Sequence, residues 1–343
     1  MKRLHSKITI GQNVFNFVNE VEITSTWKEL TDNCSITLPK KITKGDESVF
    51  IGERSIFKRG DVVKVELGYY PELTTYFEGY VDRLSLSTPV VIHCENEMWK
   101  LKQYSITKSY KSVNVNTLLT DIIKGVDFDK NDSNAEIGSF RMTNVTPVNV
   151  LEELKKTYSL ESFFKGKTLF CGLTYVPKFT KVFNITFERN VVDHSLEWKN
   201  ESDIKIKLKA ISMMPDNSKI EIEVGDVDGE ARTGHYYNLT EKQLRDIATR
   251  EIPKYKFTGF RGSFVTFGDK KISHGDVIQL RSLKFPEQNG FYFVDSSTTS
   301  FGQNGFRQNI ELGRKAIVGT DFQQSDVTNY ELTAFGAPFL IFE

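Results

Sequence analysis

Two stretches of this sequence decide its fold: "GDVVKVELGYYPE" at residues 60–72 and "GDVIQLRSLKFPE" at residues 275–287. Both begin with Gly-Asp-Val and an aliphatic residue, and both reach an aromatic residue, proline and glutamate after the same number of positions. Each then enters an aromatic, strand-like segment that ends in Val-Asp, at residues 76–82 and 290–295. Internal repeats usually mark repeated structural units. The sequence therefore predicts two related domains.

Alternating apolar and polar residues predict short β-strands around both repeats. In "EVEITS", Val21 and Ile23 alternate with charged and hydroxyl side chains, which is the period of a strand with one buried face. Several such strands, separated by short polar breaks, follow one another near each repeat, and this spacing is typical of a small antiparallel barrel. We therefore assign residues 1–104 to a first β-barrel and residues 191–315 to a second, which includes a helix at 240–252.

The segment between the repeats has a different period. Apolar residues recur at helical spacing in "VNTLLTDIIKGV", residues 115–126, and in "TPVNVLEELKKTYSL", residues 146–160. A hairpin follows, with its turn at residues 165–167. We expect a mixed α+β domain at residues 105–190 and a C-terminal extension at residues 316–343. The predicted fold class is mainly β, with two related small antiparallel β-barrels flanking a mixed α/β domain.

Charge and composition exclude several classes of protein. The 45 Lys and Arg side chains balance 45 Asp and Glu, which removes the electrostatic footprint of a dedicated nucleic-acid binder or a membrane-surface protein. No stretch approaches the ~20 apolar residues of a membrane helix, and the first residues lack an apolar segment of signal-peptide length. We expect a chain made and kept in a reducing cytoplasm. Its cysteines, too few and too far apart for a disulfide framework or a CxxC zinc site, are Cys34, Cys94 and Cys171.

One cluster of metal-ligand residue types, "HCENE" at residues 93–97, stands at the end of the first predicted barrel. Strand alternation puts His93 and Glu95 on one face, but a zinc site needs three or four ligands, and no third lies at ligand spacing. The simpler interpretation is structural. Glu95-Asn96-Glu97 would cap a short helix whose buried side chains are Met98, Trp99 and Leu101.

Other patterns of catalytic or binding sites fail at their defining positions. Residues 127–138 begin like a calcium loop, but Asp132 and Gly138 stand where glycine and a bidentate glutamate are needed. "GFRGSF", residues 259–264, does not open a helix after a strand, as a phosphate loop does. No GxSxG, HExxH or cysteine–histidine arrangement is present. We therefore expect no catalytic, cofactor-binding or metal-binding residues, and a protein that is not an enzyme.

Two strings carry a resemblance to a known family: "EITSTWKELTDNCSITLP" at residues 22–39 and "GDVVKVELGY...FEGYVDRLSLSTPVVIHCENEMWKLK" at residues 60–102. With the order barrel, mixed insertion, barrel, they resemble the tail or baseplate hub proteins of bacteriophages. That family is the late control protein D type, related to the hub part of spike proteins in contractile injection machines. The likeness covers residues 1–315 and implies a homotrimer. Its two barrels per subunit, the first like a tail-tube domain, would form a pseudo-sixfold ring.

The resemblance also implies the partners of the ring. It would join a hexameric tail tube protein to a trimeric spike or central fibre protein. Tape-measure protein and then DNA would pass through its channel without sequence-specific binding, and tight phosphate contacts along the lining would stall the DNA. No membrane and no cofactor are implied. The protein would be part of the virion, in the tail or baseplate, after assembly in the host cytoplasm.

The C-terminal stretch "AFGAPFLIFE", residues 334–343, is apolar. Large apolar side chains left in water are costly, so we expect this peptide to dock. The sequence leaves two possibilities open: a neighbouring subunit or the spike on one hand, and the chain's own domain on the other. The predicted interface residues are Phe335, Phe339, Leu340, Ile341 and Phe342.

An alternative function from another class is an all-β carbohydrate- or cell-wall-binding module of a tail or surface protein. The 26 Phe, 13 Tyr and 3 Trp residues could furnish a platform for sugars. A sugar platform needs exposed aromatic side chains on loops, whereas most of the aromatic residues here alternate inside predicted strands. A wall-degrading enzyme would need a further catalytic domain, for which no residues remain.

Overall fold

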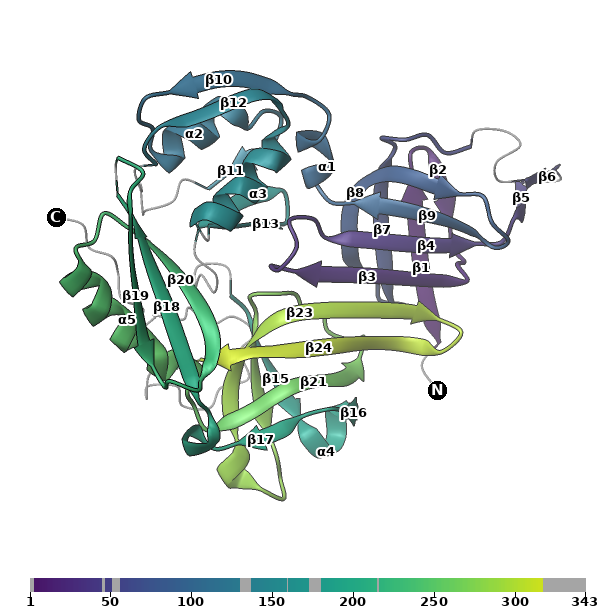
Figure 1. The fold of residues 1–343 in the computed structure, drawn as a ribbon. Coiled ribbons are helices and arrows are strands. Elements are labelled where there is room, and N and C mark those ends of the chain that lie inside the picture. Colours follow the sequence, from purple (N-terminus) through teal and green to yellow (C-terminus); the bar gives the residue numbers. More distant parts are fainter. Residues whose placement is uncertain are drawn as a thin grey trace.

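The computed structural model describes residues 3–44, 47–50, 56–129, 137–158, 160–172, 180–214 and 216–316. It is mainly β, as predicted, and Figure 1 shows two strand-rich parts side by side, with a mixed part and a smaller sheet beside them. Nearly all of the C-terminal extension lies outside the described residues. Its predicted interface residues therefore stay a prediction: Phe335, Phe339, Leu340, Ile341 and Phe342.

The first barrel is built from alternating strands whose apolar side chains point to one core. Its strands are β1 (Leu4–Ile10), β2 (Asn13–Phe15), β3 (Glu20–Thr26), β4 (Asn33–Leu38), β7 (Val62–Tyr69), β8 (Thr74–Ser85) and β9 (Val90–Glu95). They follow the order β3-β4-β9-β8-β7-β1-β2. In β7, Val63, Val65 and Leu67 are fully buried while the residues between them are not, which is the period of two expected for a strand with one wet face. A short separate hairpin joins β5 (Lys41–Lys44) to β6 (Glu47–Phe50).

The middle part contains the two predicted helices. Its elements are α1 (Met98–Leu101), β10 (Ile106–Tyr110), α2 (Val115–Ile122), β11 (Asp127–Phe128), β12 (Phe140–Val145), α3 (Pro147–Tyr158), β13 (Glu161–Lys165) and β14 (Thr168–Gly172). The side chain of Asn114 caps α2 by accepting a hydrogen bond from the Thr117 N–H at 2.8 Å. The apolar faces of the helices pack together with α1 in one core, which includes Met98, Leu118 and Leu151.

The second barrel repeats part of the strand arrangement of the first, but one of its strand pairs is parallel, whereas the pairs of the first barrel are antiparallel. It consists of β15 (Val182–Thr186), α4 (Phe187–Asn190), β16 (Val191–His194), β17 (Glu197–Lys199), β21 (Gly259–Phe267), β22 (Val277–Arg281), β23 (Gly290–Gly302) and β24 (Gly305–Lys315). Its core contains Phe264, Tyr292 and Ile310, each fully buried. The short 3-10 turn Pro286–Gln288 lies between β22 and β23.

A three-stranded sheet with one helix is inserted between β17 and β21. After a 3-10 turn at Glu201–Asp203, the strands β18 (Ile206–Met213), β19 (Lys219–Gly225) and β20 (Glu230–Tyr237) pair in the order β19-β18-β20, and α5 (Glu241–Tyr255) packs on them. A capping box begins α5, because the side chains of Thr240 and Gln243 each accept the other's backbone N–H. The predicted helix end at residue 252 was wrong: α5 continues past Pro253 to Tyr255.

The sequence repeat is also a structural repeat. Gly60 and Gly275 both have a positive φ, of 89° and 78°, which favours glycine. The N–H of Gly60 donates to the Val81 carbonyl at 2.8 Å, and the N–H of Gly275 donates to the Val294 carbonyl at the same distance. In each turn the following aspartate accepts the N–H of the residue three positions earlier, at 2.8 Å. The repeated Gly-Asp therefore encodes the same turn in both barrels.

Alanine at three glycines with positive φ, Gly60, Gly275 and Gly166, should destabilise the fold to different extents. A Cβ at Gly60 would lie 2.9 Å from Cη2 of Trp99, whereas at Gly275 the nearest atom is 3.5 Å away and at Gly166, where φ is 61°, none lies within 4 Å. Gly275→Ala and Gly166→Ala should each cost about 1–2 kcal/mol from backbone strain alone. Gly60→Ala should cost more, because Trp99 must also move. Urea unfolding measures the order, and a Gly60→Ala variant no less stable than Gly166→Ala would contradict it.

Candidate functional site: the joint between the two barrels

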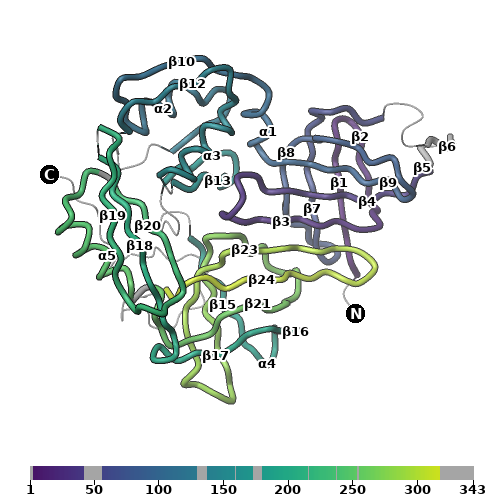
Figure 2. Tube along the Cα trace, in the orientation of Figure 1, coloured from purple at the N-terminus to yellow at the C-terminus, as the bar shows by residue number. Residues whose placement is uncertain are grey.

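The two barrels are joined by a ladder between β3 and β23. β23 runs along both barrels: its first residues pair with β22, and Ser296–Gly302 pair antiparallel with Thr26–Glu20 of β3. β24 occupies the opposite edge of β23 along most of its length. This ladder, which we call the joint, merges the two barrels into one 14-stranded sheet (Figures 1 and 2).

Polar side chains gather where β3 leaves the joint. Asp32, in the loop after β3, accepts the N–H of Thr26 at 3.1 Å, and Trp27 Nε1–H donates to the Asp295 carboxylate at 3.3 Å. Across the joint, Ser25 Oγ and Nδ1 of His274 are 2.7 Å apart. His274 lies in the repeated turn of the second barrel. The end of the first barrel is thereby bonded to the turn that defines the second.

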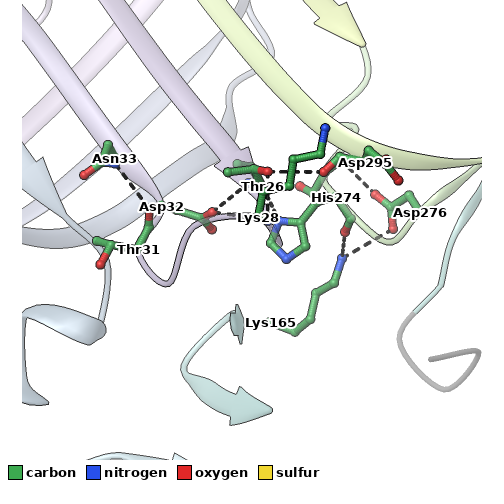
Figure 3. Close-up of polar contacts among 11 residues, drawn as sticks. Thr26, Lys28, Thr31, Asp32, Asn33, Lys165, His274, Asp276 and Asp295 are labelled. Atoms are coloured by element: carbon green, nitrogen blue, oxygen red, sulfur yellow. Dashed lines mark hydrogen bonds and ion pairs between the residues drawn. The ribbon is translucent and has the colours of Figure 1, made fainter. Parts of the chain in front are cut away.

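Lys165 of β13 brings the middle part to the same place. Its Nζ donates to the backbone carbonyl of His274 and lies 3.8 Å from Oδ1 of Asp276. Figure 3 shows Lys165 reaching the turn from the side opposite β3. The ring of Phe163, also in β13, meets the His274 ring edge-on at 5.1 Å between centroids. One cluster of contacts thus ties together three parts of the chain.

Burial shifts the ionisation of these groups. Desolvation raises the pKa of Asp32 to about 7, against the opposing effects of the Thr26 N–H and the Lys165 charge. The pKa of His274 is lowered well below its ordinary value by burial and by nearby Lys165, so the ring is neutral. Burial also lowers the pKa of Lys165, although Asp276 favours its charged form. Such shifts mark functional sites and structural ion networks alike.

Asp32 should make folding stability depend on pH. Its ordinary pKa is 3.8 and its folded pKa is about 7, so between these values the folded state binds a proton that the unfolded state releases. This contribution to stability is present at low pH and is lost as pH rises to 7, by at most about 1.4 kcal/mol for each pH unit. Asp32→Asn removes it and keeps an oxygen for the Thr26 N–H.

Urea unfolding from pH 4 to pH 8 measures this effect. Relative to the parent protein, the Asp32→Asn variant should gain stability as pH rises to 7 and then level off. His274, which is neutral when folded, has the opposite sign, since its protonation in the unfolded state favours unfolding below pH 6.5. Asp228→Asn, at an exposed turn, controls for the loss of a carboxylate. A stability difference that does not vary with pH would contradict the assignment.

The "HCENE" segment spans the end of β9 and the corner that leads into α1. Nε2 of His93 is 3.1 Å from Oγ of Ser85, and Cys94 is buried opposite Cys34. The helix cap is Asn96, whose Oδ1 accepts the Met98 N–H at 3.0 Å. Glu97, at the N-cap position, makes no side-chain cap bond. Among the described residues, no three His, Cys, Asp or Glu side chains group as metal ligands would.

Sequence reasoning missed the polar cluster. Asp276 lies within the second copy of the repeated Gly-Asp and His274 directly precedes it, but Asp32 and Lys165 belong to segments without any motif. Only the repeat could have drawn attention to this place.

In the described part of the chain, no helix is both long enough and apolar enough to cross a membrane.

The chain has the fold of bacteriophage tail proteins and of a component of a type VI secretion system. It is similar to the 43 kDa tail protein of prophage MuSo2 from Shewanella oneidensis, with a TM-score of 0.61 and 14% identity over 90% of this chain and 98% of that one. A tail protein from Neisseria meningitidis MC58 gives a TM-score of 0.62 and 12% identity, over 91% and 96%.

A third similar structure comes from a secretion machine. It is an E. coli component of the type VI secretion system, described as structurally similar to the T4 bacteriophage tail proteins gp27 and gp5. Its TM-score is 0.53 and its identity 10%, over 90% of this chain and 76% of that one. No protein-family model and no curated protein sequence matches the chain. The fold resemblance stated from the sequence is thus confirmed by structure.

Proposed function

We propose that this protein is the hub subunit of a phage tail or related injection machine, and that three copies form a pseudo-sixfold ring. The observation that supports this is the equivalence of its two barrels. They share the Gly-Asp turn and are joined side by side through β3 and β23. Three chains with two equivalent barrels each present six similar surfaces to one partner and three to another.

The proposed partners follow from this symmetry. The face with six similar surfaces binds the hexameric tail tube protein, and the other face binds a trimeric spike or central fibre protein. The channel passes tape-measure protein and DNA without reading sequence, which agrees with a net charge of zero. The protein then works in the tail or baseplate of the virion, after assembly in the host cytoplasm. The fold shared with two phage tail proteins supports this location.

The mass of the assembled protein tests the proposal. Native mass spectrometry of the purified chain, alone and with tube and spike proteins of the same machine, should show a species of three chains. Electron microscopy of that species should show a ring with six similar lobes. A chain that stays monomeric beside both partners would contradict the hub function. Binding of that monomer to cell-wall polysaccharide would favour the carbohydrate-binding alternative.

A further inference from the structure

The two barrels are equivalent strand by strand around the joint. In the first barrel Val81 of β8 pairs with Cys94, and a bulge separates it from Arg83. In the second, Val294 of β23 pairs with Leu312, and a bulge separates it from Ser296. Arg83 therefore takes the place of Ser296, the residue at which β23 begins to pair with β3.

The paired residues also identify the segment of the second barrel that corresponds to β3. Continuing along the ladders from the two bulges makes Ile36 of β4 equivalent to Phe264 of β21. Ile36 pairs with Val21 of β3, and Phe264 pairs with His194 of β16. His194 thus takes the place of Val21, and residues 194–199, which span the end of β16 and all of β17, take the place of β3. The second barrel has its own copy of the strand that makes the joint.

The two segments that correspond to the strands of the joint, the end of β8 and residues 194–199, both have an open edge. β7 pairs with β8 only up to Tyr80, and the Gly60 turn bonds Val81. Among the described residues, no strand pairs beyond that point on this edge of β8, where β23 holds β3. On the second barrel, β16 and β17 each pair with β21 and, within the described ranges, with no other strand. Open edges carry unpaired backbone N–H and C=O groups and readily accept another strand.

On these open edges, apolar side chains stand at positions that correspond to buried residues of the joint. At the joint, the core-facing residues Ser297 and Thr299 are 1% and 3% exposed. Their counterparts on β8 and just beyond it are Leu84, which is half-buried, and Leu86, which is 57% exposed. On the other open edge, Leu196 and Trp198 are half-buried counterparts of β3 residues. Apolar side chains at both edges favour contact between them.

We propose that the joint is repeated between copies of this chain: the end of β8 in one copy pairs antiparallel with the β16–β17 edge of a second copy. The register is the one seen inside the chain. It places Leu84 opposite Trp198, Ser85 opposite Glu197, and Leu86 opposite Leu196. The proposal rests on the hub function, since it closes three chains into one continuous ring of sheet. Directly opposed side chains in such a ladder have Cβ atoms roughly 4.5–5.5 Å apart.

Engineered disulfides test the register. Ser85→Cys with Glu197→Cys should link copies on oxidation and give covalent dimers and trimers on a denaturing gel, because the Cα atoms of directly opposed residues, about 4.5–5.5 Å apart, lie within the range that a disulfide spans. Thr24→Cys with Thr298→Cys is the matched internal control: this pair lies opposite in the joint and should link within one chain only. Ser85→Cys with Asp193→Cys, displaced along the edge, should not link copies. The three native cysteines are buried, which limits background.

A substitution at the exposed leucine tests the energetics. Leu86→Asp should weaken the trimer at least about tenfold, since it replaces an apolar contact by a charge, without changing the unfolding of the monomer. Val227→Asp, at a turn of the inserted sheet where Val227 is 87% exposed, is the control and should leave the trimer unchanged. Analytical ultracentrifugation measures how far each of the two variants forms the trimer.

The outcomes separate this proposal from the hub function. A trimer by mass with no Ser85–Glu197 disulfide, or a trimer insensitive to Leu86→Asp, overturns the edge pairing and leaves the hub function standing. No trimer under any condition, including with tube and spike proteins, overturns both. Inter-copy disulfides together with loss of trimer in Leu86→Asp establish the pairing.

Discussion

The pairing of β3 with β23 is the interaction on which the rest of the structure depends. β3 is the last strand of the first barrel's sheet, and without a partner its edge would carry unpaired backbone groups. β23 is 13 residues long, long enough to serve β22 and β3 in succession on one edge. Phe301 and Phe306 of the second barrel consequently lie in the core of the first. The two barrels share one sheet, and the second contributes side chains to the core of the first, so they cannot reorient without breaking both sets of contacts.

The polar cluster beside this ladder sets how the middle part is placed. A buried ion pair adds little net stability, because desolvation offsets most of the Coulomb attraction, but a buried charge left without its partners is strongly unfavourable. Lys165 finds the Asp276 carboxylate and the His274 carbonyl only if β13 is docked on the repeated turn. Asp276 also closes that turn through the Ser273 N–H. The Asp276 side chain therefore closes a turn of the second barrel and also pairs with Lys165 of the middle part.

Much of the fold could be predicted from the sequence because its signals are local. The period of β-strands, the helices around residues 115–122 and 147–158, and the repeated Gly-Asp turn each follow from a few adjacent residues. The joint could not be predicted, because it pairs residues more than 260 positions apart and edge pairing depends on backbone groups that every residue has. The helix end predicted at residue 252 was wrong because proline disfavours a helix only locally, whereas α5 continues past Pro253 and packs on the inserted sheet.

The joint within the chain and the edges outside it differ in a way that fits their tasks. Part of the internal ladder is lined by small hydroxyl side chains, such as Ser25, Ser297 and Thr299, and its other end carries the buried apolar residues Val21, Ile23 and Phe301. The connecting chain keeps the two strands at high effective concentration. A contact between separate chains must also offset the loss of translational and rotational freedom. Leu84 and Leu86, at the positions of those small residues, supply that additional apolar surface. In the proposed contact between copies, apolar side chains therefore stand at positions where the ladder within the chain has serine and threonine.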